Sequence, residues 1–501
     1  MNDPNPGGSP VDRVAVRGGV YADSVTLLQL SQAVSQAPGV QAALVAMATE
    51  LNLQLLAGMG FAPPATGSAN ELFIAVRAAD EAAVLAATAL ADELLAAPHR
   101  GGDGPRAEQP PRTIGSAAAV HGAGLALISV PGQHAFTEAM DAVTAGCDVL
   151  LFSDNVSIEH EIALKDAAAA LGLLVMGPDC GTAVVGGIGL GFAHTLRPGP
   201  VGLVAASGTG AQQVLCLLDA AGVGVSSALG VGGRDLTEQV AGRSTLAALR
   251  LLDADPATEL IMVVSKPPAG PVADLVRDAA AGSGTPVEFA LLGAGQPDLT
   301  AATEAALVAL GVAVPDWPRW LPSGRLPANR LSGRWLRGLF CGGTLCDEAM
   351  LIASAVLGPI RSNIPLRPDW ALPASLTTAG HSMIDFGADE LTRGRAHPMI
   401  DPSLRNQQLR AAAADPQTAV LLLDVVLGHG AHPDPVSELL PVLAGVGVPV
   451  VVSLIGARQD PQDLLASGAR LAEAGAAVFC SNAQATRHAL ELLDAAEGRH
   501  E

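Results

Sequence analysis

Short apolar runs alternate with longer alanine- and leucine-rich stretches along most of this chain, and this alternation constrains the fold more than any other feature. The apolar runs have the length of buried strands, whereas the stretches between them follow the period of helices. Strands and helices that alternate in this way form βαβ units, which build parallel sheets. The sequence therefore predicts an α/β protein with parallel sheets.

The first part of the chain, up to residue 198, contains six predicted strands and four predicted helices. The strands are 13–17, 40–46, 72–76, 125–130, 149–152 and 173–176, and the helices are 24–36, 80–96, 135–145 and 158–171. A stretch rich in Pro, Gly and Arg, 98–117, interrupts the pattern and is interpreted as an exposed loop or insertion. Residues 12–198 are expected to form one domain, preceded by a disordered tail, 1–11.

Two further α/β units are predicted after a Pro- and Gly-rich turn. The unit 199–314 has predicted strands 201–205, 225–229, 260–264 and 287–292, and the unit 335–501 has its clearest strands at 419–426 and 448–454. Between them, a Trp- and Pro-rich stretch, 315–334, breaks both periodicities and is predicted to be a linker. Its tryptophans are open to two interpretations, interdomain packing and ligand contact.

Composition excludes several classes of protein. The chain has 28 basic and 49 acidic residues, and its formal charge of −21 opposes binding to nucleic acid or to anionic membranes. The 6 cysteines include no CxxC pair, which argues against a zinc ribbon or a disulfide framework. The N-terminal residues are polar and no long uncharged apolar run is present. We expect a cytoplasmic protein with reduced thiols and no metal.

A small-residue turn follows the strand 201–205, and it is the clearest candidate for a ligand site. Such a turn presents backbone N–H groups and hydroxyls at the positive end of a helix, where phosphates bind. The sequence contains neither a P-loop nor a Rossmann glycine motif. The predicted phosphate ligands are Ser207, Gly208, Thr209 and Gly210. An ordinary strand-to-helix turn is the alternative interpretation.

Two further features lie at the ends of the next strands, the edge at which open α/β sheets bind ligands. Gly232 and Gly233 would let the backbone approach the same anion, and Arg234 would clamp it, unless that arginine only caps an exposed turn. Lys266 follows a buried strand in a chain that has only one other lysine, Lys165. Lys266 is therefore predicted to bind phosphate or carboxylate, and Lys165 is interpreted as a solvated charge.

The third unit repeats the pattern of strand, glycine-rich turn and helix. Gly342, Gly343 and Thr344 form the turn and are a second candidate phosphate cradle. His429 and His432 follow the strand 419–426, and each is a candidate acid or base, with an ordinary loop histidine as the alternative. An HxxH pair without a third ligand does not predict a metal site.

These motifs together resemble the succinyl-CoA synthetase family. The segments 174–182, 199–209 and 230–235 are similar, in order and spacing, to the α-subunit, and the resemblance covers about 123–292. From Arg334 onward the chain resembles the carboxy-terminal domain of the β-subunit, through 383–387 and 420–427. The resemblance implies a Rossmann-like, CoA-binding-type domain over 12–198 and two flavodoxin-like domains over 199–314 and 335–501.

The chain departs from the synthetase at three places. No histidine follows the strand 287–292, where the synthetase has its phosphohistidine, and no segment resembles the ATP-grasp domain. The segment 16–24 stands in place of the glycine loop that cradles CoA. Inorganic phosphate is therefore the expected co-substrate, and CoA is left open as a cofactor.

The chain is more similar still to the FdrA family, over nearly its whole length. The matching motifs lie at 152–156, 176–182, 232–236, 265–268, 342–344, 397–406 and 422–426. The resemblance implies a subunit of a carbamoyltransferase that converts oxalurate and phosphate to oxamate and carbamoyl phosphate in allantoin degradation. It also implies companion subunits and a small anionic substrate. The substrate-binding residues that it suggests are Asp154, Asn155, Asp179, Cys180 and Gly181.

Three hypotheses follow from the residues and the resemblance. The first is the carbamoyltransferase subunit, in which Lys266 and Arg234 stabilise charge on the transferred group and His429 or His432 moves a proton. The second is an acyl-CoA ligase of the succinyl-CoA synthetase type that needs a separate ATP-grasp partner. The third is a non-catalytic scaffold. A homo- or hetero-oligomer is expected in each case.

Overall fold

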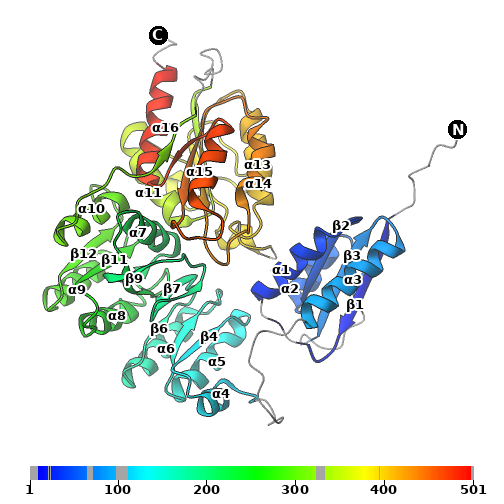
Figure 1. Cartoon of the computed structure of the whole chain (residues 1–501), viewed down its shortest axis with the longest axis horizontal. Helices are drawn as coiled ribbons and strands as arrows, with labels where there is room; N and C mark the ends of the chain where they lie inside the picture. The colour runs from blue at the N-terminus through cyan, green and yellow to red at the C-terminus, as the bar shows by residue number, and fades with distance from the viewer. Residues whose placement is uncertain are drawn as a thin grey trace. The chain divides into compact units, whose positions relative to one another are not determined.

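The computed structural model describes residues 10–20, 22, 24–64, 71–96, 111–322, 333–393 and 395–497, which form two compact units (Figure 1). One unit is Met1–Pro110 with Arg393–Ala396, and the other is Pro111–Thr392 with His397–Glu501. No helix in the described ranges is both long and apolar enough to cross a bilayer. The expected tail 1–11 and loop 98–117 lie largely outside the described residues, although β1 begins at Val11 and α4 at Ile114.

The first unit is built on a three-stranded sheet in the order β1-β3-β2. Its elements are β1 (Val11–Arg17), α1 (Ser24–Ser35), β2 (Val40–Met47), α2 (Glu50–Gly58), β3 (Leu72–Ala78) and α3 (Glu81–Ala96). β3 lies between the other two strands and is antiparallel to both. The predicted strand positions are confirmed, but the prediction of a parallel sheet is wrong here, because hydrophobic period identifies a strand without fixing its direction.

Both faces of this sheet are covered, which explains the unbroken apolar run of β3. Leu72, Ile74 and Val76 belong to one buried cluster, together with residues of α1 and α3. Phe73 and Ala75 belong to a second buried cluster with Leu56 of α2 and Phe61. A strand that is buried on both sides needs no polar alternation.

The second unit begins with a small parallel sheet of β4 (Leu125–Ile128), β5 (Asp148–Leu151) and β6 (Val175–Met176). The helices α4 (Ile114–His121), α5 (Gly132–Thr144) and α6 (Ile158–Ala170) pack with it. The expected single domain 12–198 is therefore wrong, since its first part forms the separate antiparallel unit. The segment 16–24 cannot replace a CoA loop of this sheet, because β1 is not one of its strands.

A six-stranded sheet follows, in the order β12-β11-β9-β10-β7-β8. Its strands are β7 (Thr182–Val185), β8 (Ile188–Gly191), β9 (Pro198–Ala206), β10 (Val225–Gly230), β11 (Leu260–Ser265) and β12 (Val287–Leu291). The last four strands are parallel, as predicted, and β7 and β8 form an antiparallel hairpin at the edge. Its helices are α7 (Gly208–Ala220), α8 (Arg243–Asp253), α9 (Gly270–Ala281) and α10 (Leu299–Ala309).

The third sheet has the order β13-β18-β17-β16-β14-β15 and is parallel except for β13. The strands are β13 (Arg319–Trp320), β14 (Trp335–Phe340), β15 (Ser382–Asp385), β16 (Thr418–Val426), β17 (Val450–Ile455) and β18 (Ala477–Phe479). Its helices include α11 (Gly343–Leu357), α12 (Asp389–Thr392), α13 (Ser403–Ala414), α14 (Pro435–Leu443), α15 (Leu464–Glu473) and α16 (Asn482–Glu497).

The predicted linker 315–334 is partly built into these domains. Trp317 is buried and donates from Nε1 to Glu304 of α10 at 2.8 Å. Trp320 lies in β13 and packs against Gly468 of α15. Each tryptophan thus packs against one domain, Trp317 against α10 and Trp320 within the third sheet, while 323–332 lie outside the described residues.

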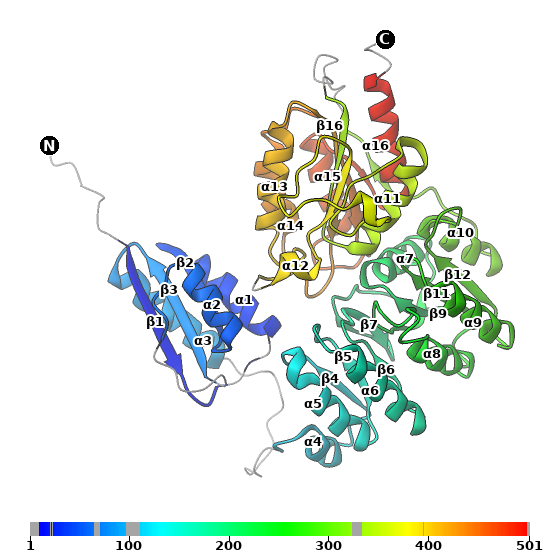
Figure 2. The ribbon, with the colours of Figure 1, turned by 180° about the vertical axis from the view of Figure 1, so that it is seen from behind.

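The two large sheets meet through helices. α7 and α10 contact α11 and α16, and Figure 2 shows the same four helices at the junction from behind. Gln213 of α7 donates to the carbonyl of Cys480 at 2.9 Å, and its own amide oxygen accepts from the N–H of Asn482 at the start of α16. These buried contacts hold the first turns of α7 and α11 together.

Candidate functional site

Two helix N-termini from different sheets meet at the centre of the second unit. β9 ends at Ala206, and the next residue, Ser207, caps α7 by accepting from the N–H of Gly210 at 3.0 Å. β14 leads to Gly342, which precedes α11. The Ser207 and Thr344 hydroxyls lie 2.6 Å apart, so the two first turns touch. Unpaired N–H groups and two helix dipoles therefore converge on one place, which favours an anion.

The approach of the two helices depends on glycine in the first turn of α11. A Cβ on Gly342 would lie 2.4–2.7 Å from three atoms of the Thr209 side chain. A Cβ on Gly343 would lie 2.7 Å from Nζ of Lys266 and 2.8 Å from Oδ2 of Asp385. Real Cβ atoms do not come this close to other atoms, so a side chain at Gly342 would have to displace Thr209, and one at Gly343 would have to displace Lys266 and Asp385.

Lys266 is the third component of this site. It directly follows β11, is half-buried, and holds its ammonium group beside Gly343. Within the described ranges this ammonium has no hydrogen-bond or ion-pair partner, so its donors are free for a ligand. We call Ser207–Gly210, Gly342–Thr344 and Lys266 the two-helix site. The structure brings together these two predicted cradles and the predicted lysine.

Two buried carboxyl groups next to Lys266 were not singled out as site residues from the sequence. Burial raises the pKa of Asp347 to about 7 and that of Asp385 to about 6, against the lowering effect of Lys266. Both lay within segments that were noted for other reasons, the glycine turn before α11 and the segment 383–387. The missing signal was their burial, which depends on contacts between two domains.

A third buried carboxylate shapes the turn rather than facing the ligand. Asp424 of β16 accepts from the N–H groups of Cys341 at 2.7 Å and Gly342 at 3.1 Å. Arg405 of α13 donates to the Asp424 carbonyl at 2.6 Å and lies 3.4 Å from its carboxylate. Asp424 therefore fixes the backbone immediately before the start of α11.

The predicted anion clamp at Gly232–Arg234 has a different role in the structure. Gly232 has a φ of 91° and packs against the carbonyl of Pro178, which leaves no room for a Cβ. Gly233 is exposed. Arg234 is paired with Glu161 of α6 at 2.9 Å and donates to the carbonyl of Val156. Its guanidinium group is thus already used in joining two domains.

The prediction that Lys165 is a solvated charge is wrong. Its side chain is 1% exposed, and its ammonium group donates to Glu161 at 2.8 Å and Asp235 at 2.7 Å. It also donates to the carbonyl of Val231. Asp235 in turn accepts from the N–H groups of Ser244 and Thr245 at the start of α8. The local sequence does not reveal this burial, because two of the partners, Val231 and Asp235, lie 66 and 70 residues away along the chain.

The residues suggested as substrate ligands follow β5 and β6. Asp154, Asn155 and Asp179 are exposed. Burial by surrounding protein, with the nearby carboxylates of Asp389 and Asp154, nevertheless raises the pKa of Asp179 to about 7, although Lys266 opposes this. The side chain of Asp179 is therefore accessible to solvent, although protein atoms surround its carboxyl group and Lys266 lies within electrostatic reach.

The next two residues face the interior. Cys180 is buried, its thiol donates to the carbonyl of Thr182 at 3.6 Å, and burial raises its pKa to about 12. Gly181 packs beside Phe192. In the structure neither offers a group to a ligand.

The two predicted acid–base histidines contact a different loop. Nε2 of His429 lies 3.1 Å from the Thr195 hydroxyl, and the backbone of His429 bridges that of Ala193. His432 is buried, and its Nδ1 accepts from the N–H of Asp434 at 3.0 Å. These contacts fit the alternative of ordinary loop histidines.

A different histidine lies beside the carboxyl groups. A Cβ on Gly387 would lie 2.7 Å from Nε2 of His397 and 3.1 Å from Oδ1 of Asp385. Burial lowers the pKa of His397 to about 4, so its imidazole is neutral at physiological pH. The sequence placed His397 in a family motif without assigning it a role.

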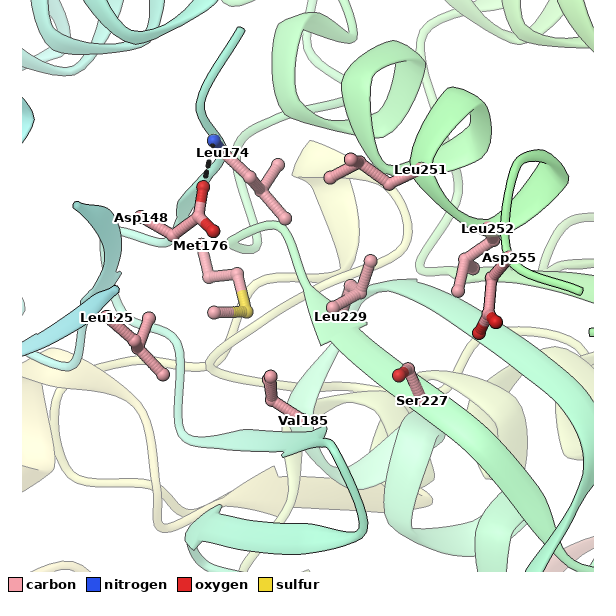
Figure 3. A pocket seen from close by; sticks show the side chains of 10 residues that line it. All are labelled: Leu125, Asp148, Leu174, Met176, Val185, Ser227, Leu229, Leu251, Leu252 and Asp255. Carbon is pink, nitrogen blue, oxygen red and sulfur yellow. Dashed lines mark hydrogen bonds between the residues drawn. The ribbon is translucent and has the colours of Figure 1, made fainter. Parts of the chain in front are cut away.

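A small cavity of about 170 Å³ lies elsewhere in this unit (Figure 3). Its lining includes Leu125, Asp148 and Leu174, which stand at the amino ends of β4, β5 and β6, and Asp148 accepts from the N–H of Leu174 at 2.7 Å. The two-helix site lies at the carboxyl ends of strands. The cavity is therefore not part of it.

The fit of CoA can be judged from the described residues near the carboxyl ends of β5 and β6. Asp154 and Asp179 place carboxylates there, and the guanidinium of Arg234 is paired with Glu161. The diphosphate of CoA requires cations or free N–H groups. These residues do not fit that part of CoA.

Comparison with known proteins places the chain among CoA-ligase relatives. Residues 339–492 match the family described as "CoA-ligase", and residues 10–111 match "AllF, heavy metal-associated domain". The chain is 38% identical over 447 residues to the uncharacterized protein YahF of Escherichia coli, covering 85% of this chain and 86% of YahF.

More distant similarity is confined to part of the chain. A succinate–CoA ligase α-subunit of Archaeoglobus fulgidus is 27% identical over 148 residues, and the chain spans 50% of its length. Among solved structures, an ATP citrate lyase from Methanothrix soehngenii matches 40% of this chain and 38% of its own, at 19% identity and a TM-score of 0.30. The α/β fold with parallel sheets is confirmed by the structure itself.

Proposed function

The chain belongs to the same protein family as YahF and carries a CoA-ligase domain, and on this premise we propose that its two-helix site binds phosphate and transfers an acyl group to or from it. The observation that carries the proposal is the contact between Ser207 and Thr344, which joins two helix N-termini beside an unpaired lysine ammonium. N–H groups, hydroxyls and one ammonium match the oxygens of a phosphoryl group.

The proposed reaction is the acyl-phosphate half of an acid–thiol ligase of the succinyl-CoA synthetase type. A thiol, as its thiolate, attacks the carbonyl carbon of an acyl phosphate, a carbon–sulfur bond forms, the bond from that carbon to the phosphate oxygen breaks, and a thioester and inorganic phosphate are released. Negative charge grows on the bridging oxygen as the bond breaks. Lys266 and the N–H groups of Gly343 and Thr344 would stabilise that charge.

CoA is the thiol to test first, although Asp154 and Asp179 place carboxylates near the ends of β5 and β6, where the CoA diphosphate would require cations or free N–H groups. A partner with an ATP-grasp domain would supply the phosphorylated acid. Companion subunits are therefore part of this proposal, and the small acid is expected to be anionic.

Phosphorolytic carbamoyl transfer is a second candidate for the same site. It is favoured by the sequence after β12, where Gly293–Asp298 contains no histidine that could carry a phosphoryl group. In this reaction phosphate attacks the carbamoyl carbon of oxalurate, the bond to the oxamate nitrogen breaks, and carbamoyl phosphate forms. The nitrogen leaves with a proton that a group at the site must supply.

Calorimetric titration of the full-length chain with inorganic phosphate tests the proposed site. We expect wild-type protein to bind phosphate and the Lys266→Met variant to bind it at least about tenfold more weakly. Arg277→Met is the matched control, because Arg277 is an exposed residue paired only with Asp274. Equal binding by all three proteins would exclude Lys266 from the site.

Product assays then separate the two reactions. Purified chain, with and without candidate companion subunits, is incubated with oxalurate and phosphate, and carbamoyl phosphate and oxamate are measured. A parallel set contains acyl phosphates with CoA, and acyl-CoA is measured. Product in only one set decides between carbamoyl transfer and the ligase reaction. Phosphate binding without product in either set would support the scaffold.

A further inference from the structure

One carboxylate oxygen faces the two-helix site without a partner. Asp385 ends β15 and is 5% exposed. Its Oδ1 accepts from the N–H of Gly387 at 2.8 Å, which fixes the side chain. Its Oδ2 has no hydrogen-bond partner within the described ranges of the chain. A carboxylate oxygen without a protein donor is left to water or to a bound ligand.

This oxygen lies at the edge of the proposed anion site. Oδ2 lies 2.8 Å from the point where a Cβ of Gly343 would stand, and Nζ of Lys266 lies 2.7 Å from the same point. Both groups therefore border the first residue of α11, whose N–H groups are the proposed anion donors. A carboxylate here would repel any anion that approaches without a proton between them.

We infer that Asp385 shares a proton with the bound anion and thereby makes the two-helix site select phosphate over sulfate. The inference rests on the proposed function, since it requires an anion at this place. At neutral pH inorganic phosphate still carries a proton, which it can donate to Oδ2. Sulfate carries none, so Asp385 must first take a proton from solution. Asp385 is thus a specificity-determining residue.

The charged groups around Asp385 come from several elements. Lys266 after β11 favours its ionised form, whereas Asp424 of β16 and Asp389 of α12 disfavour it. Asp347 of α11 is also within electrostatic reach, and the buried thiols of Cys341 and Cys346 stay protonated because burial raises their pKa.

Only some of these groups can change charge near neutral pH. His397 stays neutral above about pH 5, since its pKa is lowered to about 4. Burial already raises the pKa of Asp385 to about 6, and a bound anion would raise it further. Proton uptake between pH 6 and pH 8 therefore reports on Asp385, Asp347 and Asp179, whose pKa is also raised to about 7, and the Asp385→Asn variant isolates the part that belongs to Asp385.

The first test uses wild-type, full-length protein. Phosphate and sulfate are titrated in buffers of different ionisation enthalpy at pH 6 and pH 8, which gives the number of protons taken up with each anion. We expect sulfate to bind with uptake of close to one proton at pH 8 and to lose at least about tenfold in affinity from pH 6 to pH 8. Phosphate binding should be accompanied by the uptake of fewer protons, and the affinity for phosphate should fall less from pH 6 to pH 8. Equal proton uptake by the two anions would overturn the inference.

The second test compares Asp385→Asn with Asp389→Asn. The asparagine amide can still accept from Gly387 and can donate to either anion without a proton. We expect the preference for phosphate over sulfate at pH 8 to fall at least about tenfold in Asp385→Asn. Asp389 is exposed and disfavours the ionised form of Asp385, so Asp389→Asn should keep or enlarge the preference for phosphate, the opposite of the change expected in Asp385→Asn.

The outcomes distinguish the inference from the proposed function. If wild-type protein binds neither anion, the proposed phosphate site is wrong and the inference is overturned with it. If phosphate binds and Asp385→Asn keeps the full preference over sulfate, only the inference is wrong. If the variant does not fold, the proton-uptake measurement on the wild-type protein still decides.

Discussion

The hydroxyl groups of Ser207 and Thr344 lie 2.6 Å apart although the two residues begin helices of different sheets. Ser207 also caps α7, so its hydroxyl has one role in helix stability and another in the junction. A change in the relative position of the two sheets would separate these two residues. The anion site therefore exists only while the two flavodoxin-like domains stay in contact.

Gly343→Ala should abolish phosphate binding, because the added methyl group would occupy the space between Lys266 and Asp385. We expect affinity to fall at least about tenfold in calorimetry. Gly270→Ala is the matched control, since Gly270 starts α9 outside the two-helix site and nothing lies within 4 Å of its Cβ position. Loss of binding in both variants would show that any change at a first turn disrupts the site.

Ser207→Ala should destabilise the protein by about 1 kcal/mol through loss of the helix cap. It should also weaken phosphate binding, because Thr344 loses its partner across the junction. Ser157→Ala is the matched control for the loss of a cap, since Ser157 caps α6 outside the two-helix site. Chemical denaturation and phosphate titration measure the two effects. Intact phosphate binding in Ser207→Ala would remove Ser207 from the site.

Much of the second unit could be predicted from the sequence, because local period decides whether a segment is a strand or a helix. The two glycine turns were identified separately, and since both follow parallel strands they belong to ligand-binding edges. That they meet each other was not predictable, because it depends on contacts such as that of Gln213 with Cys480.

The errors have the same physical origin. The strand at Leu72–Ala78 was placed correctly, but its antiparallel pairing with both neighbours is a long-range property. Lys165 sits on a helix face that looks polar in sequence, yet Asp235 comes to it from 70 residues away. The sequence does not place Asp385 in the anion site, because its closeness to Gly343 depends on how β15 and α11 lie in space.

Lys165→Met should destabilise the protein by about 3–5 kcal/mol, because it leaves the buried carboxylate of Asp235 without a counter-charge and that of Glu161 with Arg234 alone. Arg243→Met is the control, since Arg243 forms a partly exposed pair with Asp166 and should cost under about 1 kcal/mol. Thermal and chemical unfolding measure both variants. Similar small effects would mean that the buried network contributes nothing to stability.

All six cysteines should be unreactive in the native protein, since each is buried and none is paired in a disulfide. Burial raises the pKa of Cys180 and Cys480 to about 12, and a protonated thiol is a poor nucleophile. Titration with a thiol reagent should find no fast-reacting group before unfolding and six after it. One fast thiol in the native protein would contradict this prediction.

Stability should decrease as pH rises from 5 to 8. The pKa of Asp347 is raised from 3.8 to about 7 by burial, so the folded protein holds a proton that the unfolded chain has lost over this range. Asp385 and Glu348 act in the same direction, with pKa values raised to about 6 and about 7. The stabilising effect of protonation is therefore present below about pH 4 and lost through about pH 7.

Asp347→Asn should reduce this dependence and stabilise the protein at pH 8 by on the order of 2 kcal/mol, because the amide needs no proton. Asp253→Asn is the matched control. The pKa of Asp253 is lowered to about 2 by hydrogen bonds, first from Ser283, so its effect on stability changes only below about pH 4. Unfolding temperatures measured from pH 5 to pH 8 compare the slopes. An unchanged slope in Asp347→Asn would show that Asp347 is ionised in the folded protein over the whole range, and that Lys266 rather than a proton balances its charge.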